Sequence, residues 1–170
     1  MRFDLSSAAV MAFAVASALA TAWWMDQAGL RGSAHAATPP PVVSAPASGR
    51  PGQVLKAADG HYWADAVIEG RVVRVMVDTG ATVVVLTPAD AARLGLKLSA
   101  ADFSGSVATA SGPVRAAPVE LTAVAVAGAR VDAVRALVVE HGLPHSLLGM
   151  SYLGRLSSFS ATPAGLTLRP

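Results

Sequence analysis

Short runs in which apolar and polar residues alternate follow one another through the second half of the chain, and glycine-containing turns separate them. Alternation with a period of two is typical of β-strands with one buried face. The turn signal Glu69-Gly70 joins the first two runs, and Ser111-Gly112-Pro113 forms the tip of a later hairpin. The predicted strands are residues 61–68, 71–77, 81–86, 107–110, 114–121, 129–140 and 165–170.

Only one segment clearly changes to a helical pattern. Thr87 can cap a helix, Pro88 suits its first position, Asp90 falls in its first turn and Gly95 can end it. Residues 145–156 indicate a loop followed by a second short helix. Many short strands with little helix predict an all-β domain, either a closed barrel or a sandwich.

The N-terminal part of the chain has a different character. Residues 5–25 carry no charge, and at about 1.5 Å per residue a helix of this length reaches about 30 Å, the thickness of a bilayer's hydrocarbon core. Trp23 and Trp24 lie at its end, where aromatic rings favour the membrane interface. An uncleaved membrane anchor is the favoured interpretation of residues 1–36. A signal peptide cleaved after Ala36 and a buried soluble helix remain the alternatives. Either of the first two predicts a protein domain outside the cytoplasm.

Residues 37–53 hold five of the chain's eleven prolines and are predicted to form an extended linker. This leaves residues 54–170 as the folded domain. The composition changes this picture little. The net charge is +2 without any basic block, which argues against a nucleic-acid partner, and the absence of cysteine excludes disulfides and thiolate chemistry.

Asp78 stands between two aliphatic runs in the stretch VVRVMVDTGATVVVL, residues 72–86. Burying an unpaired carboxylate is costly, so this aspartate must be hydrogen-bonded, chemically active, or both. Thr79 offers a hydroxyl, Gly80 lets backbone amides approach the carboxylate, and Ala81 and Thr82 keep its surroundings small. A simple turn satisfied by backbone amides is one interpretation, and a catalytic loop is the other.

Four motifs favour the catalytic loop: VMVDTGAT (75–82), DAARLGL (90–96), TASG (109–112) and HSLLGMSYLGRL (145–156). The first resembles the active-site motif of retroviral-type aspartic proteases. In order and spacing the four together resemble the bacterial single-lobe family of retropepsin-like proteases, over about residues 61–168. The resemblance implies a six- to seven-stranded β-barrel of the pepsin-lobe type and an aspartic endopeptidase activity.

The resemblance also implies roles for individual residues. Asp78 would be catalytic, and Thr79 would lock the two loops of a dimer by hydrogen bonds. Thr109, Ala110, Ser111 and Gly112 would form the flap over the substrate, and Leu147, Leu148 and Gly149 would pack behind the catalytic loop. Retroviral enzymes follow that glycine with an arginine that braces the dimer. Met150 and Ser151 stand there instead, so the brace must differ.

The mechanism of this family requires two carboxyl groups that share a proton. Among the eleven acidic residues, Asp78 alone has glycine two places on with a hydroxyl residue between. A homodimer would supply the second aspartate by symmetry. The expected substrate is an extended peptide, and neither a metal nor a cofactor is required.

Several other functions are weighed against this one. An actin-type ATPase needs a longer chain, and a haloacid-dehalogenase phosphatase needs a second aspartate where Gly80 stands. His141 and His145 are four residues apart, but Gly142 and Pro144 between them argue for a loop rather than a zinc-binding helix. A non-catalytic β domain that binds peptides or mediates assembly, and a heterodimer with a related chain, remain open.

Overall fold

The structure is a computed structural model, and it describes residues 45–109 and 112–170. The predicted membrane anchor, residues 37–44 of the predicted linker and two flap residues, Ala110 and Ser111, lie outside the described residues. Within the described ranges no helix is long and apolar enough to cross a membrane. The chain divides into two units, and the described residues all belong to the second, Val43–Pro170.

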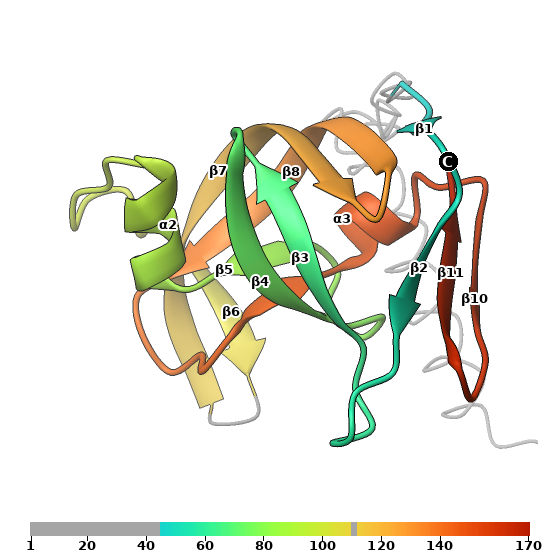
Figure 1. Ribbon diagram of the computed structural model, residues 1–170. Helices are drawn as coiled ribbons and strands as arrows, with labels where there is room; N and C mark the ends of the chain where they lie inside the picture. Colours follow the sequence, from blue (N-terminus) through green and yellow to red (C-terminus); the bar gives the residue numbers. More distant parts are fainter. Residues whose placement is uncertain (1–44, 110–111) are drawn as a thin grey trace, which may run out of the picture. The chain divides into compact units, whose positions relative to one another are not determined.

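Six strands close into a barrel (Figure 1). Neighbouring strands around the ring are β3, β4, β9, β5, β8 and β7, and the β7–β8 pairing closes it. Two further strands, β1 and β6, extend the sheet by pairing with β8 and β7. The predicted all-β closed barrel is therefore confirmed. The bounds are β1 Ser48–Gly49, β3 Trp63–Ile68, β4 Arg71–Val77, β5 Val84–Leu86, β6 Gly105–Thr109, β7 Gly112–Val126, β8 Ala129–Val139 and β9 Ser146–Leu148.

A second, three-stranded sheet lies beside the barrel, with the order β10 (Ser158–Ala161), β11 (Gly165–Arg169) and β2 (Gly52–Leu55). Figure 1 shows it on the side of the barrel opposite helix α2. Because β2 and the short edge strand β1 pair within these sheets, the described end of the predicted linker is part of the fold. The prolines of this segment are compatible with its pairing, since proline is tolerated next to an edge strand such as β1.

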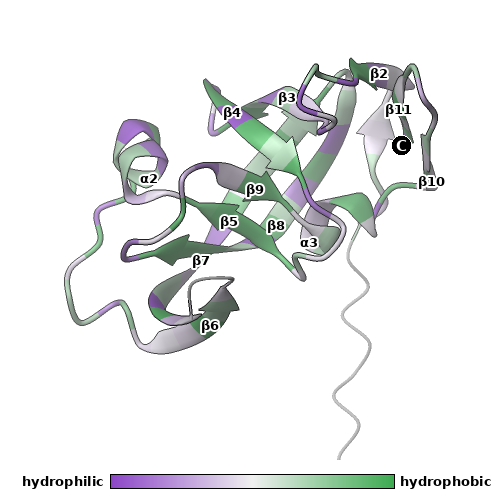
Figure 2. Cartoon of the chain, turned by 90° about the horizontal axis from the view of Figure 1, so that it is seen from below, coloured by the Kyte–Doolittle hydropathy of each residue, from purple (hydrophilic) through white to green (hydrophobic). Residues whose placement is uncertain are grey.

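Strand alternation builds the core. In β3, Ala64, Ala66 and Ile68 are buried while Asp65 and Val67 are exposed. The turn to β4 places Glu69 and Gly70 at positive φ, a conformation that glycine adopts without strain. Figure 2 shows β5, β8 and β9 coloured mainly as hydrophobic, in keeping with the many buried side chains that these wall strands give to the core. The largest fully buried side chains are Tyr152, Ile68, Leu86, Leu121, Leu148, Leu153 and Leu168.

Two short helices complete the described unit. Helix α2, Pro88–Leu94, begins as predicted at Thr87, whose hydroxyl accepts a bond from the Asp90 amide (3.1 Å), and it ends at Gly95 in the left-handed region. Helix α3, Met150–Leu153, follows β9 directly. It is tied to β8 by the buried Tyr152, whose hydroxyl donates to the Ala129 carbonyl at 2.9 Å.

The segment before α3 differs from its prediction. Residues 146–148 form strand β9 rather than a loop, parallel to β4 and antiparallel to β5. Three residues are too few to show a period in the sequence. Tertiary pairing on both sides determines their conformation.

Candidate active site

Asp78 is the first residue after β4, at the point where the chain leaves the barrel wall. Its backbone amide donates to the Leu148 carbonyl at 3.1 Å, which continues the pairing between β4 and β9. The loop then runs through Thr79, Gly80 and Ala81 to β5. The residues of the predicted catalytic loop are therefore held by strands on both sides.

The carboxylate of Asp78 is half-buried and fixed by its own loop. The Gly80 amide donates to Oδ1 at 2.8 Å, and the Ala81 amide donates to the Asp78 carbonyl at 3.3 Å. A Cβ on residue 80 would lie 3.2 Å from Oδ1, tighter than ordinary contact. Glycine at this position lets the amide reach the carboxylate closely, as the sequence predicts.

Gly149 packs directly behind this loop. The Met150 amide donates to the Ala81 carbonyl at 2.8 Å, and Leu148 is fully buried. A Cβ on Gly149 would lie 2.1 Å from the Val83 carbonyl oxygen and 2.6 Å from that of Ala81. No side chain fits between two backbone segments at such distances.

Ser151 stands near the place where retroviral enzymes have an arginine, and it contributes within its own subunit. Its hydroxyl accepts from the Val84 amide at 2.9 Å and donates to the Arg135 carbonyl at 2.7 Å. It thereby joins β5, β8 and α3 behind the loop.

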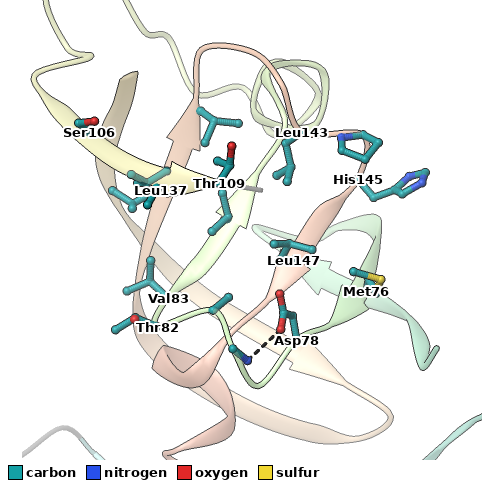
Figure 3. Close-up of a pocket in the computed structure, with 17 residues that line it drawn as sticks. Met76, Asp78, Thr82, Val83, Ser106, Thr109, Leu137, Leu143, His145 and Leu147 are labelled. Atoms are coloured by element: carbon teal, nitrogen blue, oxygen red, sulfur yellow. Dashed lines mark hydrogen bonds between the residues drawn. The ribbon is translucent and has the colours of Figure 1, made fainter. Parts of the chain in front are cut away.

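A cavity of about 680 Å³ opens beside Asp78 (Figure 3). Among the described residues that line it, Asp78 is the one carboxylate and His145 the one other titratable side chain. Gly80, Ala81, Thr82, Thr109 and Leu147, all predicted site residues, share this lining. The other lining residues are Met76, Val83, Val85, Ser106, Val107, Ala108, Leu137, Val139, Leu143 and Pro144.

The remaining predicted site residues that the structure describes lie around the cavity rather than on its wall. Thr79 is exposed on the surface of the catalytic loop. Gly112 begins β7, and its carbonyl accepts from the Thr109 hydroxyl at 2.7 Å across the hairpin. Leu148 and Gly149 lie behind the loop. The structure brings the catalytic-loop residues and the described base of the predicted flap to one cavity.

The comparison with protein families agrees with this geometry. The family model of the gag-polyprotein putative aspartyl protease matches residues 64–155, which include Asp78 and Gly149 and more than half of the chain. The chain belongs to this retropepsin-like aspartic protease family. The resemblance drawn from the four motifs is thus confirmed.

Related proteins support the same assignment. The crystal structure of a retropepsin-like aspartic protease from Rickettsia conorii matches with a TM-score of 0.64 and 31% identity, covering 72% of this chain and 92% of that one. A Rickettsia prowazekii protein, Uncharacterized protein RP867, is 35% identical over 62% of this chain and 46% of its own length. A Sinorhizobium protein, Uncharacterized protein in cobV 5'region, is 36% identical over 67% and 49%. The chain spans about half the length of these two curated relatives.

Sequence reasoning missed several cavity residues of this retropepsin-like domain. Leu137, Val139 and Leu143 form part of its apolar wall, and they pack with the flap strands around Val114 and Ala116 as a second small core. A period of two identifies which residues share a face of a strand. It does not say which face borders a cavity and which a packed core.

His145 was also missed as a lining residue, although its segment was predicted correctly to be a loop. Residues 140–145 contain neither helix nor strand. The His145 ring lies 4.8 Å from the Trp63 ring, centroid to centroid, at an angle of 86°. This contact links the cavity to β3, which precedes β4 along the chain.

A buried polar network fixes β9 from the other side. The Ser146 hydroxyl, fully buried, donates to Asp90 Oδ2 at 2.6 Å and accepts from the Thr87 amide at 3.1 Å. Asp90 also accepts from the Thr87 hydroxyl at 2.9 Å. Ser146, which lies between His145 and Leu147, is therefore hydrogen-bonded to the N-terminus of α2 and to the end of β5.

The carboxylate of Asp59 gives one testable pH dependence in the loop that supports Trp63. It accepts from the His61 amide at 2.9 Å and from the Trp63 indole at 2.8 Å, and these bonds, the backbone one first, lower the pKa of Asp59 below its ordinary value of 3.8. Because the pKa is lower in the folded state, the ionised carboxylate stabilises the fold. This stabilisation is complete at pH values above the unfolded-state pKa and is lost as the pH falls through the folded-state pKa.

We therefore expect Asp59→Asn to lower the thermal midpoint near neutral pH, and the difference from the wild type to shrink as pH falls below about 4. Thermal unfolding followed by circular dichroism across acid to neutral pH measures this. A difference that stays constant with pH would contradict an ionic role for this carboxylate.

Proposed function

We propose that the protein is an aspartic endopeptidase that acts as a homodimer, with Asp78 contributed once by each subunit. The observation that carries this proposal is the placement of Asp78. Its carboxylate is fixed by the Gly80 amide and borders a cavity of about 680 Å³, and the described lining residues contain no second carboxylate. A cleavage site of this kind needs two, so it is completed by a second copy of the chain.

In the proposed dimer the two Asp78 carboxyl groups meet at the two-fold axis and share one proton, because two like charges that close cannot both be ionised. The ionised carboxylate takes a proton from water, and the resulting hydroxide attacks the peptide carbonyl carbon. The neutral carboxyl donates its proton to the carbonyl oxygen. Collapse of the tetrahedral intermediate then breaks the C–N bond. The leaving nitrogen takes the proton that the first carboxylate removed from water, and a hydroxyl of the intermediate returns a proton to the second carboxylate as the new carboxylic acid forms.

The surface around Asp78 supports this assembly. Thr79 and Thr82 are exposed on either side of Gly80, so their hydroxyls are accessible to a second copy. We infer that Thr79 hydrogen-bonds the opposite catalytic loop. Ser151 is already used inside its own subunit, so the dimer is braced by other groups than those that follow Gly149 in retroviral enzymes.

The substrate is proposed to be an extended peptide that lies between the catalytic loop and the β6–β7 hairpin. Thr109 lines the cavity next to the turn of this hairpin, and residues 109–112 would close over the peptide. An extended peptide exposes its backbone amides and carbonyls, which suits recognition beside strands.

The N-terminal segment gives the proposed location. Residues 1–36 are proposed to anchor the protein in a membrane, with the peptidase domain outside the cytoplasm. Because β1 begins at Ser48, the end of the predicted linker belongs to the folded domain. Anchoring would concentrate subunits in a plane and favour pairing.

The deciding experiment is digestion of a peptide library by the full chain from acid to neutral pH, with products identified by mass spectrometry and subunit number measured by sedimentation. Specific cleavage by a dimer is expected. Binding of peptides without cleavage would favour a non-catalytic β domain. Activity that appears only when a related chain is added would favour a heterodimer.

A further inference from the structure

We propose that His145 selects the substrate, and that the preferred substrates are peptides with an acidic side chain close to the cleaved bond. The inference rests on the proposed peptidase function, and it concerns which peptides are accepted. It starts from the lining of the cavity. Most of the wall is apolar, and among the described lining residues His145 is the one basic side chain.

The register of β9 turns His145 toward the cavity. Ser146 and Leu148 are buried, whereas Leu147 lines the cavity, so the alternation of the strand gives His145 the same side as Leu147. In Figure 3, Leu147 is drawn between Asp78 and His145.

The same register separates His145 from the catalytic carboxylate. Ser146 pairs with Val75, so His145 lies level with the residue four places before Asp78, about 13 Å away along the strand. His145 is therefore a specificity residue and not a member of the catalytic pair. It would meet a substrate side chain rather than the cleaved bond.

The imidazole is supported from behind by Trp63. The two rings meet edge to face, and the Trp63 indole is itself fixed by its bond to Asp59. The Arg74 guanidinium covers the Trp63 ring at 5.6 Å and pairs with Asp65 at 3.6 Å. We infer that Trp63 is a positioning residue, because it limits the orientations that the exposed imidazole can adopt.

The ring nitrogens remain available to a ligand. In the described parts of the chain no hydrogen bond reaches either nitrogen of His145, while the neighbouring Asp59 carboxylate is occupied by the His61 amide and the Trp63 indole. An N–H bond to a carboxylate is about twice as strong as one to a neutral amide. A glutamate or aspartate side chain is thus the partner that this site favours over its amide counterpart.

The test compares peptides that differ only by Glu, Gln or Leu, placed in turn at each position around a bond that the full-length wild type cleaves. At about pH 5 we expect kcat/KM to be about three- to tenfold higher for Glu than for Gln at one position. His145→Leu should remove this ratio, so that the Glu and Gln peptides are cleaved with equal kcat/KM. Trp63→Phe, which loses the bond to Asp59, should reduce the ratio.

His141→Leu is the matched control, because His141 lies in the same loop but is exposed and does not line the cavity. It should keep the Glu preference. If the wild type cleaves peptides without that preference, or His145→Leu retains it, the inference fails while the peptidase function stands. If no peptide is cleaved, the peptidase function fails. Binding of the same peptides to the Asp78→Asn protein, with and without His145→Leu, then decides the inference.

Discussion

Asp78→Asn is expected to abolish peptide cleavage while leaving the fold intact. Asparagine has nearly the same size and can still accept the Gly80 amide bond, so the loop keeps its geometry. It cannot take a proton from water, and a symmetric dimer loses both carboxyl groups at once. Because general acid–base catalysis contributes roughly 10²–10⁴-fold per group, we expect a loss of at least about 10⁴-fold in kcat. Initial rates on a cleaved peptide, with circular dichroism for the fold, measure this.

Asp65→Asn is the matched control, since Asp65 is exposed and contacts Arg74 outside the cavity. It should retain activity. Residual cleavage in Asp78→Asn comparable to the wild type would overturn the catalytic assignment.

Mixing the wild type with the Asp78→Asn protein tests whether the active site is shared between two subunits. In a roughly ninefold excess of Asp78→Asn protein, random exchange puts about nine of ten wild-type chains into mixed dimers, so activity should fall to about one tenth. An unchanged rate under exchange would indicate that one chain acts alone.

The backbone geometry of the loop at Asp78 was the part of this protein that the sequence predicted best. Asp78 is followed by small residues between two aliphatic strands, a local pattern that determines its own backbone bonds. The helix at Pro88–Leu94 was equally local, because its cap, first turn and final glycine lie within nine residues of one another. In both cases the information lies in adjacent residues.

What the sequence did not predict depends on partners that are distant along the chain. Strand β9 has three residues and is defined by β4 and β5, and β2 pairs with β11 across more than a hundred residues. The cavity wall has the same origin. Leu137 and Leu143 are ordinary apolar residues until the β6–β7 hairpin folds beside them.

The position of Gly149 is the clearest product of such a distant contact, and Gly149→Ala should be strongly destabilising for a change of one methyl group. The backbone of Gly149 is extended, so the conformation itself suits alanine. The cost comes from the new Cβ, which would lie 2.1 Å from the Val83 carbonyl oxygen. Relief requires moving the segment between Asp78 and β5 away from β9. We expect a loss of about 3 kcal/mol or more in the free energy of unfolding, measured by urea denaturation.

Gly80→Ala is the control for this steric effect, because it also replaces a glycine by alanine but brings the new Cβ against no backbone atom. Its Cβ would approach only the Asp78 carboxylate oxygen, at 3.2 Å, and a side chain can shift where two carbonyl groups cannot. Its stability should change by less than about 1 kcal/mol, although the carboxylate moves and cleavage slows. If Gly149→Ala unfolds at the same urea concentration as Gly80→Ala, the inference that Gly149 packs closely behind the loop at Asp78 is contradicted. The support that this packing gives to Asp78 would then have to come from the Leu148 and Ala81 backbone bonds alone.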